Sequence, residues 1–250
     1  RGYLGRASHW PQAVSANSDP QQLGDEAVLL ARRTRAAVFA GPQRVAAGRA
    51  LLQRAPRDVL ICDDGLQHYA LYHDVEIATV DMTRGHGNGW CLPAGPLREP
   101  PSRLQQVDAV VALGGGPGDG HTMQLLPAAA CRITDPANRR DIESFRGNVL
   151  HAVAGIGDPE RFFTLLRGAG LTIQPHAFAD HHPFRAEDLD FADDKPVLMT
   201  EKDALKCGAF SKENWWFVPV DAQLDAAFYD WLFNVLDKGM NREGLEGSNG

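Results

Sequence analysis

The chain has 250 residues, of which 44% are hydrophobic and 23% charged, and this balance is typical of a folded globular protein and excludes a disordered one. Its net charge of −7 gives no overall basic field, so nucleic acid is not expected as a partner. The four cysteines form no CxxC pair, which argues against a zinc site or a disulfide framework and favours reduced thiols. No apolar run approaches the ~18–20 residues of a membrane span.

The first half of the chain alternates helical patterns with short, β-rich apolar runs. Helices are predicted over residues 27–33 and 43–53, and strands over residues 59–62, 75–80 and 109–113. An alternation of this kind favours βαβ units on a parallel sheet. The fold class expected from it is therefore α/β.

Basic residues are concentrated early in the chain. The segment from Arg32 to Arg57 contains seven arginines and no acidic residue. One interpretation is a solvated helix face, and the other is a surface that meets phosphates or an anionic membrane. The pattern leaves both interpretations open.

A second series of elements begins at residue 149. A strand over residues 149–154 is followed by Asp158 as the N-cap of a helix, with Pro159 in the first turn. The remaining predicted elements are strands over residues 171–178, 196–199 and 216–220 and a closing helix over residues 226–236.

The domain boundary is expected where periodicity is lost, around residues 134–147, because this stretch is rich in charge and has no apolar period. The predicted organisation is a core domain over residues 1–135, a linker over residues 136–148 and an α/β domain over residues 149–238. Residues 239–250 are polar and rich in glycine, and we expect a disordered tail there.

Several short stretches carry candidate chemistry, the first of them at Asp25. This residue precedes the predicted helix over residues 27–33, where an acid is commonly an N-cap. The alternative is a general base presented at the edge of the sheet. Spacing alone does not choose between the two.

Asp63 and Asp64 follow the predicted strand over residues 59–62. Acids at the carboxyl end of a parallel strand lie where α/β folds bind ligands. Two adjacent carboxylates suit Mg²⁺, which prefers oxygen ligands, and the pattern is that of a Walker B strand. An acidic turn that caps the next element is the alternative.

Two glycine-rich stretches follow. In the loop over residues 84–100, Arg98 offers a phosphate clamp and Glu99 a further metal carboxylate. Residues 114–118 read Gly-Gly-Gly-Pro-Gly, but no lysine in the chain follows a glycine, as a GxxxxGK[ST] phosphate loop requires. A flexible connection is therefore expected at residues 114–118.

The stretch Asp180-His181-His182-Pro183 offers metal ligands or an Asp–His pair, with a surface turn as the alternative. Adjacent side chains on an extended chain point to opposite sides, so the two histidines are not expected to share one metal. Residues 200–204, Thr-Glu-Lys-Asp-Ala, form a strand-to-helix junction with charged residues at the sheet edge.

Seven motifs in register together resemble the tetraacyldisaccharide 4'-kinase family over residues 1 to about 236. They are Arg1-Gly2-Tyr3, Gly24-Asp25-Glu26, Asp63-Asp64-Gly65-Leu66-Gln67-His68, residues 92–100, residues 155–163, Asp180-His181-His182-Pro183-Phe184 and Met199-Thr200-Glu201-Lys202-Asp203-Ala204.

The resemblance implies a P-loop NTPase-like parallel-sheet domain, incomplete at its amino terminus, with a second, smaller α/β domain. It implies transfer of the ATP γ-phosphate, with Mg²⁺, to the 4'-hydroxyl of the disaccharide precursor of lipid A, at the cytoplasmic face of the bacterial inner membrane. The site residues that it implies are Asp25 and His181 as the pair that activates the hydroxyl, Asp63, Asp64 and Glu99 at Mg²⁺, the same two aspartates with Gln67 and Arg98 at ATP, and Arg44 and His68 at the substrate.

Family members carry a membrane-associated helix and a Gly-Lys-Thr phosphate loop upstream of Arg-Gly-Tyr, and the 250 residues contain neither. We therefore expect this chain to transfer phosphate poorly. Two alternatives are a non-catalytic relative that binds lipid or nucleotide, and a Mg²⁺-dependent phosphohydrolase that uses Asp63 and Asp64 with His181.

Overall fold

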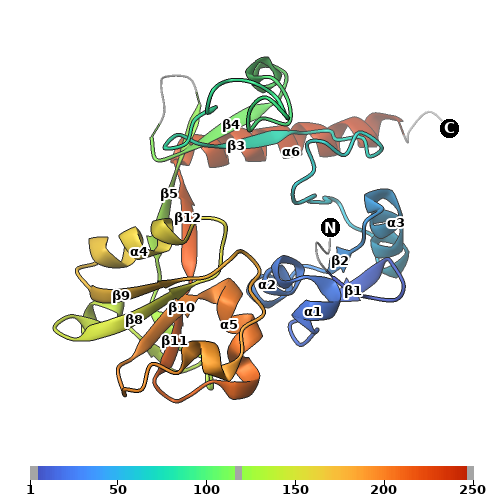
Figure 1. Ribbon diagram of the computed structural model, residues 1–250. Coiled ribbons are helices and arrows are strands. Elements are labelled where there is room, and N and C mark those ends of the chain that lie inside the picture. Colours follow the sequence, from blue (N-terminus) through green and yellow to red (C-terminus); the bar gives the residue numbers. More distant parts are fainter. Residues whose placement is uncertain (1–4, 116–119, 247–250) are drawn as a thin grey trace. The chain divides into compact units, whose positions relative to one another are not determined.

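The computed structural model describes residues 5–115 and 120–246, with side chains described up to residue 239. The chain forms two compact units, each made of two segments. The first unit contains the residues up to Pro56 together with Leu126–Asp221, and the second contains Arg57–Leu125 together with the residues from Ala222 on. Both units are built from helices and largely parallel sheets (Figure 1).

The first unit is centred on a six-stranded sheet with the order β7-β6-β11-β10-β8-β9. The strands β8, β9, β10 and β11 pair in parallel, and β6 and β7 extend the sheet by antiparallel pairing next to β11. The bounds are β6 Ala130–Arg132, β7 Arg139–Arg140, β8 Val149–Ala154, β9 Thr172–Ala177, β10 Val197–Thr200 and β11 Trp215–Val218.

Both faces of this sheet are covered by apolar side chains. Along β10, Leu198 packs into one core, whereas Val197 and Met199 pack into the other, as the alternation of side chains along a strand requires. Because both faces are covered, β10 is an uninterrupted apolar run rather than an alternating one.

Helices cover each face. The α4 helix Pro159–Gly168 contributes Phe162, Phe163 and Leu166 to the core that contains Leu198. The short helix α5, Glu201–Cys207, contributes Ala204 and Cys207 to the opposite core. Three 3₁₀ segments complete the unit: η2 Ile142–Phe145, η3 Ala186–Leu189 and η4 Gly208–Phe210.

The amino-terminal segment of the first unit forms a smaller layer. Its strands β1 Gln12–Val14 and β2 Val38–Ala40 pair antiparallel, and its helices are α1 Pro20–Leu23, α2 Asp25–Arg33 and α3 Arg44–Arg54. Val28 of α2 is fully buried in the core of this layer, and Leu205 of α5 packs against the same core. This packing fixes the start of α2 beside the start of α5.

The second unit contains a four-stranded sheet with the order β12-β5-β4-β3, in which β3, β4 and β5 are parallel neighbours. Asp225 accepts hydrogen bonds from the backbone N–H groups of Thr122 and Phe228, and so joins β5 to the first turn of the long helix α6. The bounds are β3 Ile77–Asp81, η1 Pro101–Gln105, β4 Ala109–Leu113, β5 His121–Pro127, β12 Val220–Leu224 and α6 Ala226–Glu246.

Four expectations differ from the structure. Residues 59–62 are not a strand, and Ile61 is 94% exposed. The predicted linker over residues 136–148 contains β7 and η2, whose Ile142 and Phe145 are buried in the core of the first unit. The predicted tail is helical up to Glu246, and the predicted strand over residues 216–220 is divided between β11 and β12.

These differences have a common cause. An apolar run becomes a strand only where a neighbouring strand takes its backbone hydrogen bonds and packs on its side chains, and residues 59–62 lack such pairing among the described residues. Conversely, the short 136–148 stretch is held by the tertiary core, which supplies the order that its sequence pattern does not indicate.

Candidate active site

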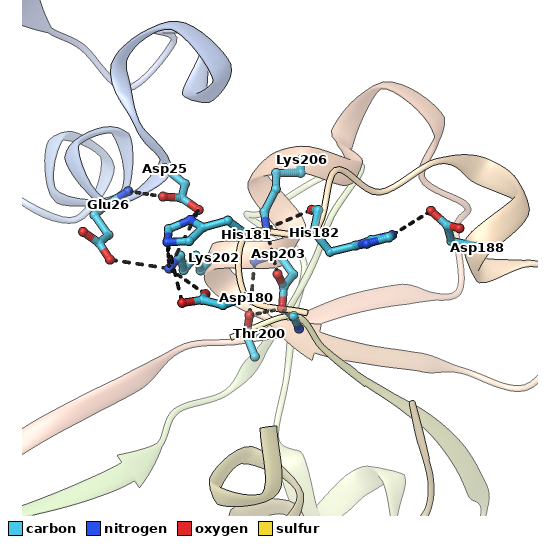
Figure 2. A network of polar contacts seen from close by, with 11 residues as sticks. Asp25, Glu26, Asp180, His181, His182, Asp188, Thr200, Lys202, Asp203 and Lys206 are labelled. Carbon is cyan, nitrogen blue, oxygen red and sulfur yellow. Dashed lines mark hydrogen bonds and ion pairs between the residues drawn. The ribbon is translucent and has the colours of Figure 1, made fainter. Parts of the chain in front are cut away.

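The carboxyl ends of three neighbouring parallel strands meet at one edge of the six-stranded sheet. Gly155 follows β8, Asp180 and His181 follow β9, and Lys202 follows β10. Figure 2 shows Asp180, His181 and Lys202 gathered with Asp25 and Glu26 at the start of α2. In α/β folds this edge is where ligands bind, so the cluster is the candidate active site.

Asp25 and His181 lie in direct contact within this cluster. Nδ1 of His181 is 3.0 Å from Oδ2 of Asp25, although 156 residues separate them in sequence. The side chain of Asp25 is only 8% exposed, and its Oδ1 accepts the N–H of Glu26. A largely buried carboxylate beside an imidazole is an arrangement that takes up and holds a proton.

The interpretation of Asp25 as a helix cap is not what the structure shows. Gly24 is the N-cap of α2, with φ of 90°, and Asp25 is the first helical residue. The carboxylate therefore lies in the first turn of α2, at the amino-terminal end of the helix. Its second oxygen remains directed at His181.

The backbone holds His181 in an uncommon conformation. Its φ is 59°, in the left-handed region, which costs a non-glycine residue about 1–2 kcal/mol. The N–H of His181 donates to the carbonyl of Gly155, at 3.2 Å, and this bond ties the residue to the end of β8. Such a conformation persists only where surrounding contacts impose it, which fits a residue held for function.

Lys202 occupies the centre of the charged groups. Its Nζ lies 3.4 Å from Oε1 of Glu26, 3.4 Å from Oδ1 of Asp180 and 3.9 Å from Oδ2 of Asp25. The same nitrogen is 3.5 Å from Nε2 of His181 (Figure 2). The sequence marked Lys202 only as one of several charges at a strand-to-helix junction, without a role.

Asp203 is a further residue whose importance the sequence analysis missed. It is fully buried, and its Oδ2 accepts hydrogen bonds from the hydroxyl of Thr200, at 2.6 Å, and the N–H of Gly155, at 2.8 Å. Its Oδ1 pairs with Nζ of Lys206, at 3.0 Å. The detectable signal was the Thr-x-x-Asp spacing of a capping box, since Thr200 is the N-cap of α5.

The two adjacent histidines face different partners. His182 contacts Oδ2 of Asp188 at 3.0 Å, whereas His181 contacts Asp25. The hydrogen bond from His182 is the main cause that lowers the pKa of the Asp188 carboxyl. The two imidazoles therefore serve separate contacts.

In the second unit, two of the predicted residues are in contact. Nε2 of Gln67 donates to Oε2 of Glu99 at 2.6 Å, and the hydroxyl of Tyr69 donates to Oε1 at 2.5 Å. Arg103 lies 3.5 Å from the same carboxylate. The hydrogen bonds from Gln67 and then Tyr69 lower the pKa of Glu99, and Tyr69 and Arg103 were not predicted as partners.

The fit of Mg²⁺ can be judged from these carboxylates. Among residues 5–115 and 120–239, no three or more His, Cys, Asp or Glu side chains are grouped closely enough to hold a metal ion. Glu99 is therefore not gathered with Asp63 and Asp64 into a three-ligand site. Asp63 and Asp64 are exposed, and a pair of carboxylates that leaves room for phosphate oxygens and water is a common Mg²⁺ site.

The remaining predicted residues are dispersed. Arg44 is buried at the first position of α3 in the first unit. His68, which is half-buried, and Arg98, which is exposed, belong to the second unit. The Arg1-Gly2-Tyr3 motif and residues 116–118 of the glycine-rich stretch lie outside the described residues.

Comparison with known proteins gives the site its context. A family model described as LpxK, tetraacyldisaccharide-1-P 4'-kinase, matches residues 1–237. The chain belongs to this family. A tetraacyldisaccharide 4'-kinase of Nitrosococcus oceani is 52% identical over 243 residues, which are 97% of this chain and 72% of that protein. A kinase of the same name from Methylobacillus flagellatus is 48% identical, over 97% of this chain and 73% of its own length.

A solved structure has the same fold. It is the crystal structure of the "apo" form of LpxK from Aquifex aeolicus in complex with ATP, with a TM-score of 0.73 and 24% identity. The match covers 94% of this chain and 77% of the other. The predicted α/β, P-loop NTPase-like fold class and the predicted LpxK family are both confirmed.

Proposed function

We propose that this chain carries the acceptor-activating part of a tetraacyldisaccharide 4'-kinase. In that reaction the γ-phosphate of ATP is transferred to the 4'-hydroxyl of the tetraacyldisaccharide 1-phosphate precursor of lipid A. The observation that carries the proposal is the contact between Asp25 and His181, 3.0 Å apart at the ligand-binding edge of the sheet, in a member of the LpxK family.

The chemistry follows from the requirements of phosphoryl transfer. The protein has little covalent work to do, and it must position the reactants and neutralise charge. Asp25 takes the proton of the 4'-hydroxyl, and His181 holds the carboxylate in place. The hydroxyl oxygen then forms its bond to the γ-phosphorus while the bond to the bridging oxygen breaks, and ADP leaves.

Charge on the transferring group has to be balanced by cations. Asp63 and Asp64 would hold Mg²⁺, which supplies positive charge to the phosphates when it is bound. Arg98 would contact the phosphates of ATP, with Gln67 beside it, and Arg44 and His68 would contact the acceptor. Glu99 holds Gln67 and Tyr69 through hydrogen bonds, so its part in this proposal is to orient Gln67.

These 250 residues are expected to bind ATP weakly. The sequence contains no GxxxxGK[ST] segment, whose backbone N–H groups and lysine cradle the phosphates of ATP in P-loop enzymes. We propose that the chain binds the acceptor and transfers phosphate slowly.

The substrate also implies a location. A lipid acceptor would be met at the cytoplasmic leaflet of the bacterial inner membrane, where anionic headgroups attract basic segments such as Arg32–Arg57. In the described part of the chain, no helix is long and apolar enough to cross a membrane. We propose that this basic segment contributes to an association that is either peripheral or made through an amino-terminal helix such as family members carry.

The role of Asp25 can be tested by its removal. The assay follows transfer of labelled γ-phosphate from ATP to the tetraacyldisaccharide, with the chain completed by the part of the Nitrosococcus oceani kinase that it does not match. Asp25→Ala should lower kcat by roughly 100-fold or more and leave KM for the acceptor nearly unchanged, because a general base contributes about 10²–10⁴-fold.

The control is Asp190→Ala, which removes an exposed carboxylate that pairs with Lys212 on the surface of the same unit. It should leave turnover unchanged. An Asp25→Ala protein with wild-type turnover would contradict the assignment of the base. Release of phosphate from a soluble phosphomonoester without ATP would favour the Mg²⁺-dependent phosphohydrolase instead.

A further inference from the structure

Lys202 lies among four polar side chains, two of which take part in the proposed reaction. Two are the proposed base Asp25 and its neighbour His181, and the others are the carboxylates of Glu26 and Asp180. The side chain of Lys202 is 16% exposed. It is thus largely removed from solvent, where a surface lysine would sample many rotamers.

The surroundings fix where the ammonium lies. Lys202 is in the first turn of α5, whose start is anchored by Thr200 and the buried Asp203. On the side of α2, Nε of Arg33 lies 3.5 Å from Oε2 of Glu201, the residue before Lys202. The ammonium therefore lies between carboxylates of α2 and the loop after β9.

The donor inventory then constrains the imidazole. An ammonium has three N–H donors and no acceptor, so toward Nε2 of His181 it can only donate. Nε2 must accordingly present its lone pair, which leaves the ring proton on Nδ1. That nitrogen faces Oδ2 of Asp25 at 3.0 Å, where an N–H is well placed to donate to the carboxylate.

The charges that face His181 lead to the same state. Asp25, from α2, and Asp180, from the histidine's own loop, present carboxylates to its ring, and Glu26 of α2 pairs with Lys202. Lys202, from α5, is the cation placed among them. When this cation is absent, Oδ2 of Asp180, 3.7 Å from Nε2, remains beside that nitrogen as an acceptor to which an N–H on Nε2 could donate.

We propose that Lys202 is a positioning residue that keeps Nε2 of His181 unprotonated and its proton on Nδ1. This inference rests on the proposed function, since the consequence is that Asp25, rather than His181, is the group that takes the proton of the hydroxyl. Lys202 itself touches neither reacting atom in this role. It acts through the protonation state of its neighbour.

The test measures that state directly. In the chain with ¹⁵N-labelled histidine near pH 7, the chemical shift of an imidazole nitrogen shows whether it carries a proton, and His181→Gln assigns the signals. Nε2 of His181 should be unprotonated in the unaltered chain. It should become protonated in Lys202→Met, which keeps the length of the side chain and removes its charge, and should stay unprotonated in Lys202→Arg, whose guanidinium is also a donor only.

Lys212→Met is the matched control, because Lys212 is exposed and pairs with Asp190 away from the site. It should leave the His181 signals unchanged. A protonated Nε2 in the unaltered chain overturns the proposal whether or not Lys202→Met folds, as does an unprotonated Nε2 in Lys202→Met. The expected protonation states in a completed chain that transfers no phosphate would contradict the proposed function alone.

Discussion

The carboxylate of Asp203 is fully buried, and three donors converge on it. They are the hydroxyl of Thr200, the N–H of Gly155 and the ammonium of Lys206. Through Gly155, whose carbonyl accepts the N–H of His181, this buried group sets the position of the candidate site. Its removal would take this acceptor from the hydroxyl of Thr200 and the N–H of Gly155, and would leave the ammonium of Lys206 with the carbonyl of His182 but without its carboxylate.

Asp203→Ala should therefore lower the free energy of unfolding by about 3–5 kcal/mol, the cost of breaking a buried ion pair by removing one partner. Urea denaturation followed by circular dichroism measures this value. Glu213→Ala is the control, since Glu213 is 76% exposed and pairs with Arg132 at the surface, and it should change stability by less than about 1 kcal/mol. Equal effects of the two substitutions would show that Asp203 has no special structural role.

At the scale of single residues, the sequence predicted chemistry better than geometry. Asp25 and His181 were both visible as candidates, and the family resemblance paired them. Lys202 and Asp203 were visible only as charges after a strand, because burial and distance depend on contacts between segments far apart in sequence. Lys202, for example, donates to Glu26, which lies in a helix 176 residues earlier in the chain.

At the scale of elements, prediction succeeded where local pattern and tertiary environment agree. The strands β4 and β8 were predicted at their observed bounds, because each is a β-rich apolar run followed by glycine. The helix α3 was predicted within one residue of its observed bounds, and the start of α4 was predicted from Asp158 and Pro159. The run over residues 59–62 has an equally apolar pattern, but a strand also needs a partner, which no local pattern specifies.

The end of α4 offers a test of local backbone rules. Gly170 has φ of 81°, and an added Cβ would lie 2.9 Å from Nε of Arg146, whereas Gly168 is helical and a Cβ there would meet nothing within 4 Å. Gly170→Ala should destabilise the protein by about 1–2 kcal/mol because left-handed backbone penalises a side chain. Gly168→Ala should instead stabilise it by up to about 1 kcal/mol, since alanine favours helix.

Thermal denaturation of the two single variants distinguishes the outcomes. The shifts in Tm should have opposite signs, with Gly168→Ala serving as the control for Gly170→Ala. A Gly170→Ala protein as stable as the unaltered chain would mean that the turn after α4 adapts to a side chain.

At the scale of the whole molecule, several carboxyls make stability depend on pH in the same direction. Hydrogen bonds from the N–H groups of Thr122 and Phe228 lower the pKa of Asp225 to about 2. Lys195 lowers the pKa of Asp193, and Gln67 lowers that of Glu99. Burial raises the pKa of Glu201, which acts in the opposite direction.

For a carboxyl whose pKa is lower in the folded state, the stabilisation is present above its unfolded pKa of about 4 and is lost as the pH falls toward the folded pKa. The urea midpoint should therefore decrease between about pH 5 and pH 2. Asp225→Asn, which cannot ionise, should show a smaller decrease. A midpoint independent of pH over this range would contradict the prediction.

The division of the whole chain was the least predictable feature. A boundary read from the sequence has to divide the chain into consecutive pieces, whereas each observed unit combines two separated segments. Residues 134–147 look like a linker because they have no apolar period, but the core of the first unit buries Ile142 and Phe145. Membership of a unit follows from contacts across the sheet, and these are not visible in a local window.

This discontinuity has a consequence for biosynthesis. During translation, the segment ending at Pro56 leaves the ribosome well before Leu126–Asp221, on which its unit depends. At about 5–20 residues per second, the amino-terminal layer waits roughly 10–30 s for its partner, with the start of the other unit emerging in between. Over that interval the apolar residues of α2 are exposed on a nascent chain. They would present a binding site for ribosome-associated chaperones until β8, β10 and α5 have been synthesised.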